Sequence, residues 1–210
     1  MLDKKGLYDL LDQYGMAYEA FEHPAVYSIE EMDALNLPHS ERVAKNLFLR
    51  DDKKQHYYLV TVPGHKTVNL RSLREQIASR KLTFASEESL RELLMLEKGH
   101  VTPLGVLNNA EKNVIVIFDR SLQNRQIGIH PMENTATIFM AFEDVEKLIQ
   151  NHRQNRRCQR SKPRRFAARG ELLLQGCRQH GRHHLYQRGQ RQHRRAEKRR
   201  SGAVQRRPRE

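Results

Sequence analysis

The chain has 210 residues and a formal net charge of +13, with 30% charged and 38% hydrophobic residues, and this length suits one domain with or without a tail. No run of 18 apolar residues occurs, and the first 15 residues are amphipathic and acidic, which excludes a membrane span and a signal peptide. We therefore expect a cytoplasmic protein without a membrane partner.

The excess positive charge is confined to the C-terminal part of the chain. Residues 1–152 contain 18 Lys and Arg against 22 Asp and Glu, a net charge of −4, whereas residues 153–210 contain 20 against 3, a net charge of +17. Both cysteines, Cys158 and Cys177, lie in the second part, so the first part can hold neither a disulfide nor a cysteine-bound metal. The sequence thus predicts a domain over residues 1–152 and a basic tail over residues 153–210.

Within the domain, the hydrophobic period alternates between that of helices and that of strands. Helices are expected at residues 7–14, in a short segment capped by Ser28, and at residues 69–80, 86–96 and 143–152. Strands are expected at residues 17–23, 42–51, 55–63, 81–86, 113–122, 126–132 and 136–142, of which the second and third form a hairpin. Because their order is irregular, we expect a single compact α/β domain with a mixed, largely antiparallel sheet flanked by helices.

After residue 152 the periodicity stops, and the stretch ELLLQGC at residues 171–177 is the only apolar cluster. The remainder cannot bury enough apolar surface to offset the entropy lost on ordering. We expect a disordered tail.

Lys45 and Asn46 lie inside a predicted strand, where polar residues are not needed for packing. Lys45 has the same parity as Val43, Leu47 and Leu49 and should share their face. A lysine is rarely buried without a partner, so an inward Lys45 indicates a cleft or an anion contact. A bulge that turns Lys45 to solvent is the alternative.

The loop GHVTPLG, from Gly99 to Gly105, combines two glycines with Pro103 and indicates an unusual backbone between a helix and a strand. Such a loop can direct successive N–H groups at a carbonyl oxygen or a phosphate. An ordinary helix-to-strand connection is the simpler interpretation of the spacing alone.

His130 precedes Pro131, which favours an extended backbone, and Asn134, Thr135 and Thr137 follow. The histidine could be an acid or base, the polar wall of a pocket, or only a residue at a strand end, which is the usual case. The motifs HExxH, CxxC, GxSxG, Walker A and GxGxxG are all absent. The sequence therefore predicts a cleft-type site without a metal or a cofactor.

Four segments, AKNLFLRD, GHVTPLG, NVIVIFD and IHPMENTATI, together resemble the YbaK/ProX family of prolyl-tRNA editing proteins, which are relatives of the editing domain inserted in prolyl-tRNA synthetase. The resemblance runs from about Leu7 to Gln150. The segments HPMENTATI and FEHPAVYSIEEM are more similar to the ProX branch, which acts on alanine attached to proline tRNA.

The resemblance implies a metal-independent hydrolase that cleaves the ester between a wrong amino acid and the 3′ adenosine of tRNA, here mischarged Ala-tRNA(Pro) cleaved in trans. Such correction is needed because a synthetase pocket sized for proline discriminates by only ~1–3 kcal/mol per missing methylene. The expected partners are the tRNA(Pro) acceptor end and prolyl-tRNA synthetase. The alternatives are a Cys-tRNA(Pro) deacylase and a non-catalytic tRNA-binding module.

The resemblance also implies roles for individual residues. Lys45 matches the family's key lysine, which would hold the terminal phosphate or ester region, and Gly99 and Pro103 match the loop whose backbone would polarise the carbonyl. The implied substrate-binding residues are Asn46, Thr102, His130 and Asn134. His130 would set the size of the amino-acid pocket, and water would attack with help from the ribose hydroxyl.

The net charge of −4 opposes the approach of the domain to a polyanion unless its basic residues cluster. A basic middle stretch contains Lys45, Arg50, Lys53, Lys54, Lys66, Arg71, Arg80 and Lys81. If these residues share one face, they can contact phosphates of the acceptor stem.

The tail lacks Asp, Ile, Thr and Met, and the family usually ends with a short apolar strand after the last helix. We hypothesise that a frameshift near codon 152 produced the tail. The competing hypothesis is an arginine-rich arm that binds RNA non-specifically. Under either hypothesis the tail does not carry the catalysis.

Overall fold

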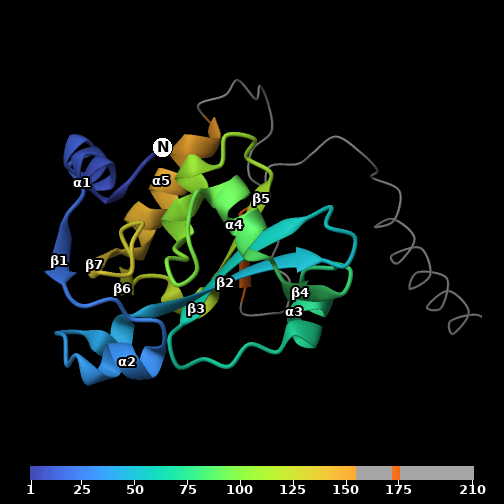
Figure 1. The fold of residues 1–210 in the computed structure, drawn as a ribbon, viewed down its shortest axis with the longest axis horizontal. Helices are drawn as coiled ribbons and strands as arrows, with labels where there is room; N and C mark the ends of the chain where they lie inside the picture. The colour runs from blue at the N-terminus through green and yellow to red at the C-terminus, as the bar shows by residue number, and fades with distance from the viewer. Residues whose placement is uncertain (155–171, 176–210) are drawn as a thin grey trace, which may run out of the picture. The chain divides into compact units, whose positions relative to one another are not determined.

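The computed structural model describes residues 1–154 and 172–175 (Figure 1). The helices are α1 (Lys4–Gln13), α2 (Ile29–Ala34), α3 (Leu70–Gln76), α4 (Glu87–Leu94) and α5 (Phe142–Gln154), and the 3₁₀ helices are η1 (Ser40–Arg42), η2 (Pro103–Asn108) and η3 (Arg120–Leu122). The strands are β1 (Tyr18–Glu22), β2 (Ala44–Asp51), β3 (Tyr57–Pro63), β4 (Leu82–Phe84), β5 (Val114–Asp119), β6 (Gln126–Ile129), β7 (Ala136–Ala141) and β8 (Leu172–Gln175). None of the helices in these ranges is long and apolar enough to span a membrane.

The strands form two sheets, one with the order β4-β2-β3-β5-β8 and one with the order β1-β7-β6. Every neighbouring pair is antiparallel except β3 and β5, which run parallel. The predicted class, a mixed and largely antiparallel α/β fold flanked by helices, is therefore confirmed. The prediction of one sheet differs from the structure, because in the described residues the two sheets share only one β-bridge, the parallel bridge between Val43 and Gly128.

Strand β2 shows why Lys45 faces inward. Its residues pair one to one with β3, from Ala44 opposite Pro63 to Arg50 opposite Tyr57, so the alternative of a bulge is wrong. Leu47 and Leu49 share the face of Lys45 and pack in a cluster of apolar residues that α3 covers. The even-numbered residues of β2 point to the other face of the sheet, toward the main core.

Three apolar clusters hold the fold together. The main core lies against one face of the five-stranded sheet and is covered by α1, α4 and α5, with Phe118 and Phe142 in edge-to-face contact at 5.0 Å between ring centroids. The second lies under α3 on the opposite face. The third contains Met32 of α2 together with Val43 and Phe139, so α2 covers the place where the two sheets meet.

The helix starts follow the expected capping chemistry. The side chains of Ser28 and Ser86 accept hydrogen bonds from the third N–H group after them, as predicted for both. Helix α1 ends at Gln13, followed by Gly15 with a φ of +62°. Helix α3 ends at Gln76, earlier than the predicted end at residue 80.

The described residues include two segments of the predicted tail, residues 153–154 at the end of α5 and the strand β8. Leu172–Gln175 forms β8, which lies antiparallel to β5 at the edge of the five-stranded sheet and falls within the apolar cluster ELLLQGC. The first compact unit accordingly runs from Met1 to Cys177. The predicted disorder of residues 155–171 and 176–210, and the two hypotheses for the origin of the tail, concern residues outside the described ranges.

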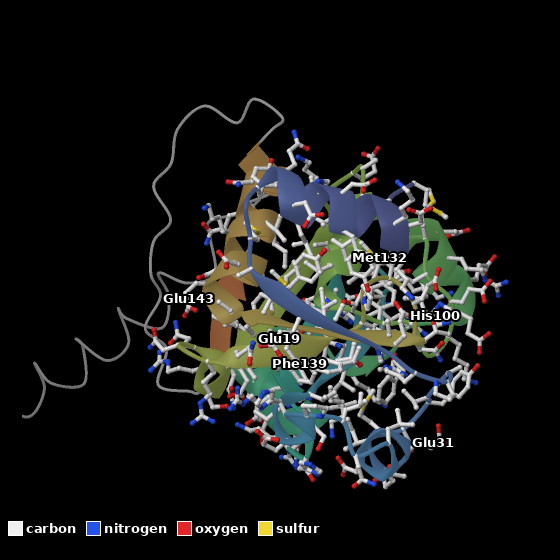
Figure 2. The ribbon with its side chains drawn as sticks, turned by 90° about the vertical axis from the view of Figure 1, so that its left-hand side faces the viewer. Glu19, Glu31, His100, Met132, Phe139 and Glu143 are labelled. Atoms are coloured by element: carbon white, nitrogen blue, oxygen red, sulfur yellow. The ribbon has the colours of Figure 1, made fainter. Side chains whose placement is uncertain are left out.

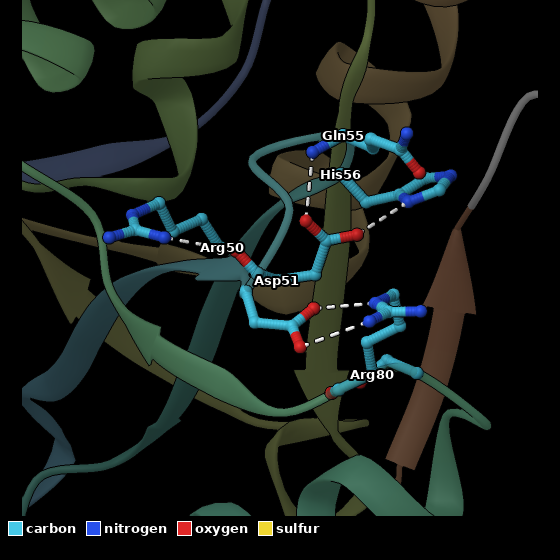
Figure 3. Close-up of polar contacts among 7 residues, drawn as sticks. Arg50, Asp51, Gln55, His56 and Arg80 are labelled. Atoms are coloured by element: carbon cyan, nitrogen blue, oxygen red, sulfur yellow. Dashed lines mark hydrogen bonds and ion pairs between the residues drawn. The ribbon is translucent and has the colours of Figure 1, made fainter.

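The turn between β2 and β3 is organised by the buried Asp51 (Figure 3). One carboxylate oxygen accepts the N–H of Gln55 at 2.8 Å, and the other contacts Nδ1 of His56 at 2.9 Å. Burial alone would raise the pKa of the Asp51 carboxyl, but these hydrogen bonds outweigh burial and lower that pKa below its ordinary value. The ionised carboxylate therefore stabilises the hairpin.

We expect Asp51→Ala to lower the free energy of unfolding at pH 7 by about 1–3 kcal/mol, because the N–H of Gln55 loses its hydrogen bond to a charged acceptor. A carboxyl with a lowered folded-state pKa stabilises the fold above its unfolded pKa and loses that effect as the pH falls through the folded value. The difference from the parent protein should therefore shrink from pH 7 to pH 3 in urea unfolding followed by circular dichroism. The control is Asp9→Ala, which removes an exposed ion pair with Lys5 and should cost less than about 1 kcal/mol. An equal loss in both variants would contradict the assignment.

Candidate functional site

The junction of the two sheets brings two of the predicted site residues to the same place. The Val43–Gly128 bridge is parallel, so the chain continues in the same direction on both sides of it. Lys45 and His130 each lie two residues beyond the bridge, the first in β2 and the second directly after β6. The beginning of β2 and the end of β6 therefore supply Lys45 and His130 to one region of the fold.

The close approach of the strands at this junction depends on Gly128. A Cβ atom at this position would lie 2.7 Å from a ring carbon of Phe139 and 3.1 Å from a methyl carbon of Val43. The first distance is shorter than packed atoms tolerate, so a larger residue would separate the sheets.

Lys45 is half-buried, and its ammonium group makes no hydrogen bond or ion pair with any residue in the described ranges. The effect of its charge on Glu30, a residue of α2, indicates where Lys45 lies relative to that helix. The carboxyl pKa of Glu30 is lowered, first by hydrogen bonds from its own backbone N–H and from Ser28, and then by the charges of Lys45 and His65. Lys45 is therefore a cation on the α2 side of the sheet.

His130 is held as a neutral imidazole. Its Nδ1 lies 3.1 Å from the carbonyl oxygen of Ala136, which can only accept, so Nδ1 carries the hydrogen. Burial lowers the pKa of His130 most, and the nearby His23 and His100 lower it further. Its Nε2 atom has a lone pair and no hydrogen-bond partner within residues 1–154 and 172–175, and so can accept a hydrogen bond from a ligand.

His23 lies next to His130 and was not among the site residues predicted from the sequence. Its ring lies 6.4 Å from the ring of His130 between centroids. Its Nδ1 donates to the carbonyl of Pro24 at 2.8 Å, and its Nε2 therefore accepts from the hydroxyl of Thr137 at 2.9 Å. The pair of His-Pro dipeptides in the sequence, at residues 23–24 and 130–131, was the one available indication.

The loop that begins at Gly99 packs against the segment between β1 and α2. Gly99 has a φ of +87°, and a Cβ atom there would lie 2.7 Å from the ring of Tyr27 and 3.2 Å from Nδ2 of Asn134. Figure 2 shows His100 and Glu31 on either side of the segment that leads from β1 to α2. Glycine is thus required at residue 99 by both conformation and space.

Asn134, predicted to contact substrate, is 1% exposed and bonds to the protein itself. The side-chain Nδ2 of Asn134 donates to the backbone carbonyl of Val26 at 3.0 Å. The backbone carbonyl oxygen of Asn134 accepts a hydrogen bond from the N–H of Val26 at 3.3 Å. These two bonds fix the segment before Tyr27 beside Gly99. The structure assigns Asn134 a positioning role, while a direct contact with a ligand remains a prediction.

Thr102 and Pro103 lie below the surface at the start of η2. The Thr102 hydroxyl is buried without a partner in the described part of the chain. The backbone N–H groups of Val101 and Thr102 likewise find no acceptor among those residues. Thr102 is fully buried, so of these two donors only the N–H of the half-buried Val101 can reach an oxygen atom at the surface of the loop.

Asn46 is not brought together with Lys45. Strand alternation places it on the opposite face of β2, where its Oδ1 accepts a hydrogen bond from the buried hydroxyl of Thr61 at 2.8 Å. The parity of the two residues already implied this separation.

Several residues of the basic middle stretch are neutralised by carboxylates. Ion pairs join Lys66 to Asp119, Arg71 to Glu75 and Arg80 to Asp52. Within the described ranges, ion pairs are absent for Lys45, Arg50, Lys53, Lys54 and Lys81. The sum of the charges in this stretch therefore overstates the cations available to a phosphate backbone.

Two hollows of the described residues lie away from these groups. One, of about 570 Å³, lies between the N-terminus and η2 and includes Leu2, Met95 and Asn108, and the other, of about 320 Å³, borders α1 at Tyr8 and Glu133. None of the predicted site residues lines either hollow. In the described part of the chain no three His, Cys, Asp or Glu side chains are grouped to bind a metal ion.

Comparisons with known proteins identify the family of the chain and support its fold. The profile of the family described as "Aminoacyl-tRNA editing domain" matches residues 23–148. The chain is 40% identical over 147 residues to the Prolyl-tRNA editing protein ProX of Acetoanaerobium sticklandii, which covers 70% of this chain and 90% of that protein. It is 35% identical over 141 residues to Prolyl-tRNA synthetase associated domain-containing protein 1 of Bos taurus. This match covers 63% of this chain and 80% of the bovine protein. The crystal structure of "hypothetical protein APE2540" has a TM-score of 0.57 at 18% identity, covers 69% of this chain and 93% of that one, and supports the fold.

A comparison of two glycine variants tests the packing of this loop. Gly15 also has a positive φ, but a Cβ atom there would meet nothing within 4 Å. We expect Gly15→Ala to lower the free energy of unfolding by about 1–2 kcal/mol from backbone strain alone. Gly99→Ala should lower the free energy of unfolding by more than Gly15→Ala does, and it should shift the aromatic NMR signals of Tyr27. Equal losses of stability in the two variants, with unchanged Tyr27 signals, would show that the close contact does not exist.

Proposed function

The chain belongs to the aminoacyl-tRNA editing domain family and is an aminoacyl-tRNA deacylase, and from this membership we propose that its substrate is proline tRNA mischarged with alanine, cleaved in trans. Its similarity to a protein named for prolyl-tRNA editing supports the choice of tRNA. The need for a small pocket follows from the mistake to be corrected, since alanine enters a site shaped for proline at little cost. We place this reaction in the cytoplasm, with prolyl-tRNA synthetase as the partner that supplies the mischarged tRNA.

The observation that carries the proposal is a cation that forms no ion pair within residues 1–154 and 172–175, in the same region of the fold as a neutral histidine with an unused acceptor. Lys45 can contact the phosphate that precedes the terminal nucleoside, because its ammonium has no partner among residues 1–154 and 172–175. The Nε2 lone pair of His130 can accept a hydrogen bond from the α-ammonium of the amino acid. These contacts would hold both sides of the ester that is to be cleaved.

The loop after Gly99 would act on the carbonyl. The N–H group of Val101 would donate to its oxygen and stabilise the negative charge that develops when water adds. Water then forms the new carbon–oxygen bond, with its proton taken up through the neighbouring ribose hydroxyl. The ester bond breaks, and the 3′ oxygen leaves as the protonated hydroxyl of the free tRNA. Thr102 and Pro103 would fix the loop from below.

We expect Lys45→Ala to lower kcat/KM by about 100-fold or more, because the ester loses a positioned charge, while the circular dichroism spectrum stays unchanged. The assay follows release of the amino acid from proline tRNA charged with alanine, cysteine or proline. Lys5→Ala is the control, because Lys5 lies exposed on α1 and pairs with Asp9. Full activity of Lys45→Ala would overturn its role. Release of cysteine alone would change the substrate, and release of no amino acid by the parent protein would indicate a binding module.

The pH dependence of the reaction tests the state of His130. Its lowered pKa means that the ring becomes half-charged at a pH below the ordinary histidine value of 6.5. We therefore expect kcat/KM, corrected for spontaneous ester hydrolysis, to fall at acidic pH with a midpoint below 6.5. His130→Asn should remove this acidic limb along with most of the activity. A midpoint above pH 6.5 in the parent protein would contradict a neutral His130.

A further inference from the structure

Tyr27 is the most exposed aromatic side chain in the described ranges, with 68% of its surface accessible. Tyr8 and Tyr18 stack on each other, with parallel rings 5.5 Å apart, whereas no ring of the described residues stacks on Tyr27. An aromatic ring left open to water is a large apolar surface available to a ligand.

The ring is held in a defined place although it is exposed. The N–H of Tyr27 donates to the Glu31 carboxylate at 2.7 Å, and Glu31 is itself in the first turn of α2. The preceding residue, Val26, is bound on both sides of its peptide by Asn134. Gly99 provides the space that one edge of the ring occupies. Such preorganisation reduces the entropy lost when a ligand binds.

Tyr27 also borders the proposed ester site. Its ring lies against Gly99, at the beginning of the loop whose Val101 N–H would donate to the carbonyl, and it lies four residues after His23, the neighbour of His130. It directly precedes the helix whose Glu30 is influenced by the charge of Lys45. A ligand with its ester at Lys45 and His130 therefore has a flat aromatic surface beside it.

We propose that Tyr27 is a stacking platform for the 3′-terminal base of the tRNA, an inference that rests on the proposed deacylase function. Stacking suits this end of the molecule, because it recognises the flat face of a base without reading its edge and tolerates a single-stranded, unpaired base. A base fixed on Tyr27 holds its ribose, and with it the ester, in register with Lys45 and the loop after Gly99. Asn134 and Gly99 then serve the substrate indirectly, by holding the ring.

The first test measures stacking without any chemistry. Uncharged tRNA(Pro) with 2-aminopurine in place of its terminal adenine is saturated with the full chain, and the fluorescence of the complex is recorded. We expect stacking on Tyr27 to quench the fluorescence of the base. The complex of Tyr27→Leu should therefore be brighter than that of the parent protein, and the complex of Tyr14→Leu should be as bright as that of the parent. Tyr14 is the matched control because it is a second exposed tyrosine, at the end of α1. Equal brightness of the Tyr27→Leu and parent complexes would overturn the proposal.

The second test uses alanine release. Tyr27→Leu should raise KM by about 10-fold or more with a smaller change in kcat, and Tyr27→Phe, which keeps the ring, should restore KM. Tyr14→Leu should leave both constants unchanged. An unchanged KM in Tyr27→Leu would overturn the proposal while leaving the deacylase function intact. If the parent protein releases no amino acid, the proposed function fails, and the fluorescence measurement still decides whether the base stacks.

Discussion

The site depends on the close approach of two backbones, those of Val43 and Gly128, where the two sheets meet. Because residue 128 has no side chain, Phe139 and Val43 can occupy the space beside it, and α2 can cover both. This contact determines where Lys45 and His130 lie, since each comes two residues after one of the two bridged residues. Their mutual placement is thus fixed by main-chain geometry and packing, and no direct bond between the two side chains is needed to hold them. A functional group on a strand is positioned more accurately than one on a loop.

The electrostatic character of the site rests on two groups. Several cations elsewhere in the domain have carboxylate partners, as Lys66 has in the buried Asp119, whereas others in the described part of the basic middle stretch have none. Near the junction, the histidine is kept neutral by burial and by its neighbours, and Lys45 has no acid bonded to it, although its charge lowers the pKa of Glu30. A site with one cation outside any ion pair and several hydrogen-bonding groups favours an anionic ligand with a polar, uncharged reacting bond. A phosphate followed by an aminoacyl ester has this combination.

The sequence predicted the elements of the fold and part of the site, because both follow from local patterns. Alternation along β2 was sufficient to place Lys45 with Leu47 and Leu49, and it also implied that Asn46 faces Thr61 on the other side. The division into two sheets could not be predicted, because it depends on a contact between residues far apart in the chain. The same is true of His23 and of the bonds between Asn134 and Val26. A polar residue in a loop offers no local indication of whether it will face a ligand or another loop.

Strand β8 closes the edge of the five-stranded sheet with four residues, and β5 and β3 lie between it and β2. The main-chain hydrogen bonds of a strand require an extended segment of suitable length, and they depend less on which side chains the segment carries. The pairing of β8 therefore constrains its side chains less than the close packing beside Gly128 constrains the residues there. Substitutions in β8 should mainly affect the stability of the sheet edge, whereas substitutions beside Gly128 should change the relative positions of Lys45 and His130.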